Sequence, residues 1–114
     1  LIVCKEMQKQ KNGEKFLEYA IKVQKSNSNL IEPNILLAEA YAINKKYPES
    51  IEVYQKLLKE KPTQWDAQQG LGETMCLQGK KDEAVVYYEN LLVTLKSERK
   101  KDTIRKRIKE LLNK

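Results

Sequence analysis

The amino-acid sequence predicts an all-α protein made of about three stacked helical hairpins and one closing helix. Three observations lead to this fold class. Side chains of like chemistry return every 34 residues, each interval holds two amphipathic helical patterns, and short polar connections with Pro or Gly separate the patterns. A single pair of helices cannot bury both of its faces, whereas stacked pairs can. The repeat therefore favours a solenoid of hairpins.

The repeat becomes visible when the sequence is shifted by 34 residues without a gap. A leucine or valine recurs in all three copies, and a small residue follows it each time. Bulky apolar and aromatic side chains keep the same register further on. The aligned columns are Val3, Leu37 and Leu71; Cys4, Ala38 and Gly72; Met7, Tyr41 and Met75; Phe16, Ser50 and Ala84; Leu17, Ile51 and Val85; Ala20, Tyr54 and Tyr88; Val23, Leu57 and Leu91.

The first copy, residues 1–30, begins in the middle of a helical pattern and without an initiator Met. We therefore expect residue 1 to be a cut point within a longer protein. The second copy, residues 31–64, contains two helical faces joined by the polar segment 44–48, in which Pro48 suits the first turn of a helix. The first face is marked by Ile35, Leu37, Ala38 and Tyr41, and the second by Ile51, Tyr54, Leu57 and Leu58.

The third copy, residues 65–98, follows a break at Lys61-Pro62-Thr63. Thr63 and Asp66 resemble a capping box, which predicts Thr63 as the N-cap. The connection at residues 79–81 precedes two acids, Asp82 and Glu83, which favour the start of the next helix. The small residues Ala38 and Gly72 allow two helices to cross closely, and we expect Tyr54 and Tyr88 to fill the space opposite them.

The last segment, residues 99–114, predicts a single amphipathic helix that caps the stack, which brings the total to about seven helices. It aligns with the first helix of a copy if the preceding linker is two residues longer. Its apolar positions are Ile104, Ile108, Leu111 and Leu112.

These residues resemble the tetratricopeptide repeat family, whose 34-residue repeats carry the same succession of large, small and aromatic positions. The resemblance covers residues 1 to about 96 and departs from the pattern where Ser28 and Lys96 replace a closing proline. It implies a right-handed α-solenoid with a concave face lined by the first helix of each hairpin. The residues that carry the resemblance are Leu37, Ala38, Tyr41, Tyr54, Pro62, Trp65, Leu71, Gly72, Ala84 and Tyr88.

The resemblance implies a scaffold that binds a peptide or partner protein in this concave groove, basic at its ends and acidic in its middle. The expected contacts are Lys5, Lys9, Ile35, Glu39, Gln69, Glu73, Arg105 and Lys109, with Ala42 and Cys76 beside them. One subtype of the family clamps the carboxylate of a chaperone tail with lysine and asparagine. The comparable positions here, Lys5, Glu39, Gly70 and Glu73, include two acids, so we expect no such clamp.

The composition lowers the chance of an enzyme, and we predict none. The chain has no His, and its two cysteines lack close thiol partners, which removes the commonest general base and the usual metal sites. We therefore expect no cofactor and no metal. Cys4 and Cys76 are read as small packing residues in a reducing, intracellular and most simply cytoplasmic setting. No segment reaches the length of an apolar membrane span.

The net charge of +6 is confined to residues 96–114, which hold nine Lys and Arg against three acids, whereas residues 1–95 balance at thirteen each. The simplest interpretation is a solvated cap. The alternative function is contact with RNA, DNA or anionic lipid, led by Arg105, Lys106, Arg107 and Lys109. Self-association through the open N-terminal edge is a third possibility.

Two aromatic features carry competing interpretations. Trp65 is expected to pack on the preceding hairpin, with an exposed anchor for a partner as the alternative. Tyr41, Tyr54, Tyr87 and Tyr88 could stack on bases, but their helical spacing favours the core.

Overall fold

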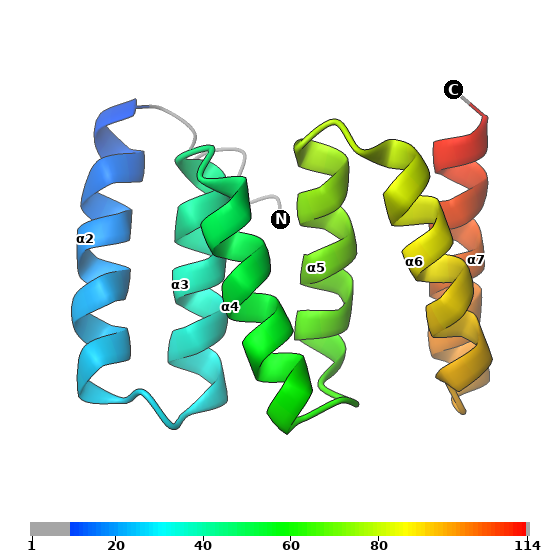
Figure 1. Ribbon diagram of the computed structural model, residues 1–114, viewed down its shortest axis with the longest axis horizontal. Helices are drawn as coiled ribbons and strands as arrows, with labels where there is room; N and C mark the ends of the chain where they lie inside the picture. Colours follow the sequence, from blue (N-terminus) through cyan, green and yellow to red (C-terminus); the bar gives the residue numbers. More distant parts are fainter. Residues whose placement is uncertain (1–9, 114) are drawn as a thin grey trace.

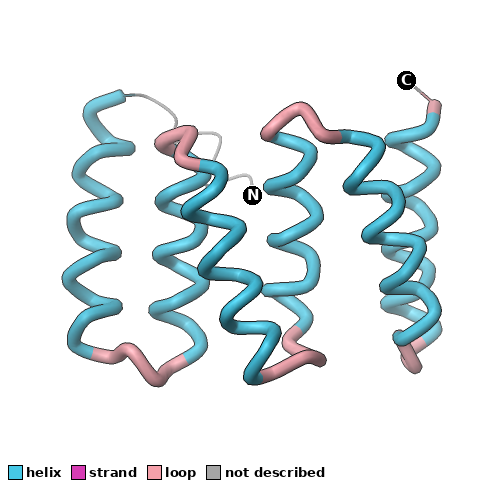
Figure 2. The backbone as a smooth tube through the Cα atoms, in the orientation of Figure 1, coloured by secondary structure: helices cyan, strands magenta, loops and turns pink. Residues whose placement is uncertain are grey.

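Every polar connection of the repeat lies between two antiparallel helices in the computed structural model, which describes residues 10–113. Within this range the chain is helical and has no strand. The helices are α2 (Gln10–Ser26), α3 (Ile31–Ile43), α4 (Tyr47–Glu60), α5 (Trp65–Leu77), α6 (Lys81–Thr94) and α7 (Glu98–Leu112). They follow one another in a row in chain order, with connections at alternating ends (Figures 1 and 2). The predicted all-α class is confirmed.

Burial repeats with the same 34-residue spacing as the sequence. In both described full hairpins a leucine, a small residue and a tyrosine are buried at equivalent positions, and Ala20 of α2 is buried in the tyrosine column. Chemically similar side chains therefore fill equivalent positions in the cores of the two hairpins. The buried pairs are Leu37 and Leu71, Ala38 and Gly72, Ser50 and Ala84, Tyr54 and Tyr88, and Leu57 and Leu91.

Both buried tyrosines fit against glycine. The ring of Tyr88 lies where a Cβ of Gly72 would be, which confirms the expected pairing of small and large residues. The ring of Tyr54 packs in one cluster with Ala38 and also occupies the position that a Cβ of Gly70 would take. Tyr54 therefore joins α4 to α5 of the next copy as well as to its own hairpin.

The turns inside the two hairpins share one backbone geometry. Lys45 and Gly79, which are 34 residues apart, both have positive φ, at 61° and 88°. The N–H of Lys46 donates to Tyr41 O at 2.8 Å, and the N–H of Lys80 donates to Met75 O at 3.0 Å. This six-to-one bond after a left-handed residue is the Schellman motif, which ends a helix sharply.

Most predicted helix starts are confirmed and one is wrong. Pro48 lies in the first turn of α4, and Asp82 and Glu83 lie in the first turn of α6. The N-cap of α5 is Gln64, not Thr63, because the Gln64 side chain accepts hydrogen bonds from the N–H groups of Asp66 and Ala67 at 2.8 and 3.3 Å. The helix begins one residue later than a Thr63 cap requires.

The closing helix covers the last hairpin, as predicted. Ile104, Ile108 and Leu111 of α7 share a core cluster with Tyr88 and Leu91 of α6. The main chains of α3 and α5 pack against each other, but α7 packs on α6 without the same main-chain contact to α5. Within the described residues, α7 therefore does not repeat the position that α5 takes beside α3.

Candidate interaction surfaces

The predicted groove residues of α3 and α5 lie on two helices that pack together. Ile35 and Glu39 of α3 and Gln69 of α5 are half-buried. Burial raises the pKa of the Glu39 carboxyl, and the nearby charge of Asp66 raises it further. Ala42 is half-buried as well. Lys5, Lys9 and Cys4 lie outside the described residues.

Glu73, predicted as a groove contact, forms an ion pair with Arg107 of the same chain. Arg107 of α7 donates from Nε to Glu73 Oε2 at 2.7 Å and from Nη2 to Oε1 at 2.9 Å. The hydroxyl of Tyr88 donates to Oε2 at 2.6 Å. Two parallel bonds between guanidinium and carboxylate give a strong and geometrically specific pair. Only 17% of the Glu73 side chain and 33% of the Arg107 side chain remain exposed.

The pKa of each proton donor in this cluster is raised by burial, by hydrogen bonding or by both. Burial and the hydrogen bond to Glu73 raise the pKa of Tyr88, and the bond to Glu73 raises the pKa of Arg107. Burial also raises the pKa of the neighbouring Cys76 thiol, with the charge of Glu73 adding to the effect. All three groups therefore keep their protons at neutral pH.

Sequence reasoning placed Arg107 among the surface cations and missed its role. Glu39, Glu73 and Arg107 are spaced by 34 residues, so an ungapped alignment puts them in one column. The two-residue offset that aligns the apolar positions of α7 instead selects Arg105 and Lys109. Because the side chains on α7 turn by about 100° per residue, Arg107 faces away from both of them.

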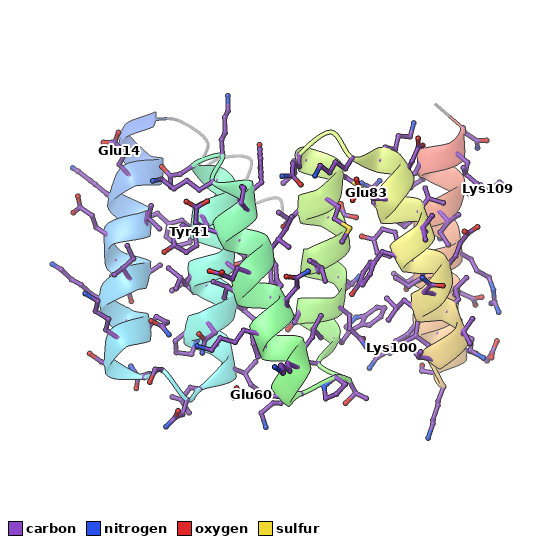
Figure 3. All side chains as sticks on the ribbon, in the orientation of Figure 1. Glu14, Tyr41, Glu60, Glu83, Lys100 and Lys109 are labelled. Atoms are coloured by element: carbon purple, nitrogen blue, oxygen red, sulfur yellow. The ribbon has the colours of Figure 1, made fainter. Side chains whose placement is uncertain are left out.

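Arg105 and Lys109 lie on the outer face of α7, apart from Glu39 and Glu73. They line an open hollow of about 660 Å³ together with Arg99 and Lys106. Lys109 projects from the outer edge of the row (Figure 3). The structure thus divides the predicted contacts between two surfaces. A second hollow, of about 560 Å³, lies between the α2–α3 connection and α4.

Trp65 packs on a different hairpin from the one predicted. It is partly buried against the cluster that contains Tyr88 and Ile104, so it contacts the following helices rather than the preceding hairpin. The Lys100 ammonium lies 5.2 Å from its ring centroid, within range of a cation–π interaction. Of the four tyrosines, Tyr54 and Tyr88 are buried, and Tyr41 and Tyr87 are half-buried, which confirms their core interpretation.

No family model, curated protein or solved structure matches the chain. In residues 10–113 no helix is both long and apolar enough to cross a membrane. The same residues contain no group of three or more His, Cys, Asp or Glu side chains that could hold a metal ion.

Proposed function

We propose that the chain is a non-enzymatic protein-binding module of the tetratricopeptide type, a right-handed α-solenoid that holds a peptide segment along α3 and α5. The observation that carries the proposal is the recurrence of buried leucine, small and tyrosine positions at 34-residue intervals. Stacked copies of one hairpin present equivalent helix faces side by side, which is how solenoids form extended binding surfaces. The two cysteines, Cys4 and Cys76, belong to the first and third copies of the repeat, and the lack of a nearby thiol partner in the sequence suits an intracellular, reducing compartment.

The contacts of Glu73 narrow the expected chemistry of the ligand. Arg107 already neutralises the Glu73 carboxylate. Glu39 has no ion pair with a described cation, and its half-buried carboxyl lies close enough to Asp66 to be affected by its charge. We therefore propose Ile35, Glu39 and Gln69 as the main contacts. They suit a peptide that combines a basic residue with an adjacent apolar one.

The test is selection of peptides from a random display library against the whole chain. Peptides with a basic residue next to an apolar one should be enriched. Their affinity should fall at least about tenfold in Glu39→Lys, which is about 1.4 kcal/mol of binding free energy. Glu89→Lys makes the same charge change at an exposed position of α6 and should leave binding unchanged. Equal affinity of the two variants, or no enrichment, would reject the proposal.

A further inference from the structure

The closing helix carries positive charge that its own acids do not neutralise. Residues 96–114 contain nine Lys and Arg against three acids. Each acid already contacts a cation of the same helix, and Lys100 lies over Trp65. The contacts are Glu98 with Lys101 at 3.3 Å, Asp102 with Arg105 at 2.7 Å and Glu110 with Arg107 at 3.2 Å. The other cations of α7, Glu98–Leu112, have no such contact among the described residues and are therefore available to an external anion.

Three of the remaining cations share one face of α7. Arg99, Lys106 and Lys109 are exposed, follow the spacing i, i+7, i+10, and have no ion pair with another described residue. Helical geometry keeps them within an arc of about 80° and spreads them over about 15 Å of the axis. With Arg105, Asp102 and Thr103 they line the open hollow on α7. We call Arg99, Lys106 and Lys109 the outer triad.

We propose that the outer triad binds the phosphate backbone of a double-stranded nucleic acid without reading its sequence. Exposed cations along a helix make the sequence-independent phosphate contacts on which non-specific affinity depends. The residues that line the hollow include no aromatic group on which a single strand could stack its bases. They also include no apolar side chain to anchor a protein partner.

The apolar face of α7 argues against a membrane surface as the partner. A helix that lies in a lipid interface inserts its apolar side chains between the headgroups. Three of the four apolar side chains of α7, Ile104, Ile108 and Leu111, are buried against α6, and only Leu112 at the end of the helix is exposed. Rotating them towards lipid would dismantle the core of the last hairpin. A rigid polyanion that needs only the polar face fits better.

The experiment measures fluorescence anisotropy of labelled 20-base-pair DNA and RNA duplexes with the whole chain in 50–200 mM KCl. Three phosphate contacts on duplex DNA correspond to a slope of about −2.7 in log K against log salt, or about 40-fold weaker binding across this range. The variant R99Q/K106Q/K109Q should bind at least about tenfold more weakly in 50 mM KCl. Circular dichroism should show an unchanged fold.

Helix α2 offers a matched control. Lys15, Lys22 and Lys25 have the same i, i+7, i+10 spacing, are exposed, and end in the last turn as Lys109 does. The variant K15Q/K22Q/K25Q has the same net charge as the first and should keep wild-type duplex affinity. Equal loss in both variants, absence of duplex binding in 50 mM KCl, or tighter binding to phosphatidylserine vesicles or polyglutamate than to the duplexes would overturn the proposal.

Discussion

The hairpin of α3 and α4 and the hairpin of α5 and α6 bury equivalent core positions, but they differ in the helices and side chains around them. Their buried leucine, small and tyrosine positions correspond at 34-residue spacing, and their turns make the same backbone bonds. They differ where a side chain meets solvent or the next helix. Lys45 corresponds to Gly79, and Glu39 corresponds to Glu73.

The two glutamates show what the difference teaches. Glu73 meets Arg107 because α7 follows its hairpin, whereas Glu39 faces α5, which contributes the charge of Asp66 nearby. One position of the repeat is therefore a structural ion pair in one copy and a carboxyl of raised pKa in the other. The repeat determines the core, and the following helix determines the chemistry of the exposed face.

The largest expected effect is at Tyr88, which occupies the same buried position of its hairpin as Tyr54 does in the hairpin of α3 and α4. Tyr88→Ala removes a buried ring and should lower the free energy of unfolding by about 3–5 kcal/mol, as for other buried aromatic truncations. Tyr88→Phe keeps the ring and removes the hydroxyl, which donates to the Glu73 carboxylate at 2.6 Å and lies 3.4 Å from the Gln69 carbonyl oxygen. It should cost about 1.5–3 kcal/mol. Urea unfolding followed by circular dichroism compares them, and a smaller cost for the alanine variant would contradict the packing.

The next effect concerns the ion pair between Glu73 and Arg107, which has no equivalent in the hairpin of α3 and α4. Arg107→Gln should lower the free energy of unfolding by about 2 kcal/mol, because it leaves a mostly buried carboxylate without its charged donors. Arg105→Gln breaks exposed contacts to Glu98 and Asp102 and should change it by less than about 1 kcal/mol.

A double-mutant cycle gives the control for this pair. Adding Glu73→Gln to Arg107→Gln should cost less than the sum of the two single substitutions, because both remove the same interaction. Additive costs, or equal costs for Arg105 and Arg107, would mean that the pair does not hold α7 to α5.

The buried positions could be predicted from the sequence because they recur every 34 residues, and this periodicity remains visible when single positions change. Sequence reasoning gave the pairing of Tyr88 with Gly72 and the covering role of Ile104. It failed where one residue of register decides the outcome. Gln64 rather than Thr63 caps α5, and Arg107 rather than Arg105 reaches Glu73, because a helix turns by about 100° at each step.

A smaller effect tests whether the two turns are equivalent. Lys45 has the left-handed conformation that Gly79 adopts at the same position. Lys45→Gly relieves this strain but frees the unfolded chain, so the net gain should be about 0.5–1 kcal/mol. Gly79→Lys should lose a similar amount. Thermal unfolding of both variants measures the difference, and a loss on Lys45→Gly would show that the lysine side chain stabilises the turn.

The smallest effect concerns the equivalent glutamates, where the same substitution should have opposite signs. Glu73→Gln weakens the pair with Arg107 and should destabilise the protein. Glu39→Gln removes a carboxyl whose pKa burial raises, and should stabilise it near pH 7 by less than about 0.5 kcal/mol.

The sign of the Glu39 effect follows from proton linkage. Because its pKa is higher in the folded state than in the unfolded state, the wild type loses stability as pH rises through the two values. The Gln variant does not titrate there. The gain should therefore be near zero well below the unfolded pKa and reach its full size above the folded pKa. Unfolding midpoints of both proteins from about pH 3 to pH 7 measure this trend. A gain that is larger in acid would mean that the folded protein favours the ionised carboxylate, as an unseen cationic partner of Glu39 would require.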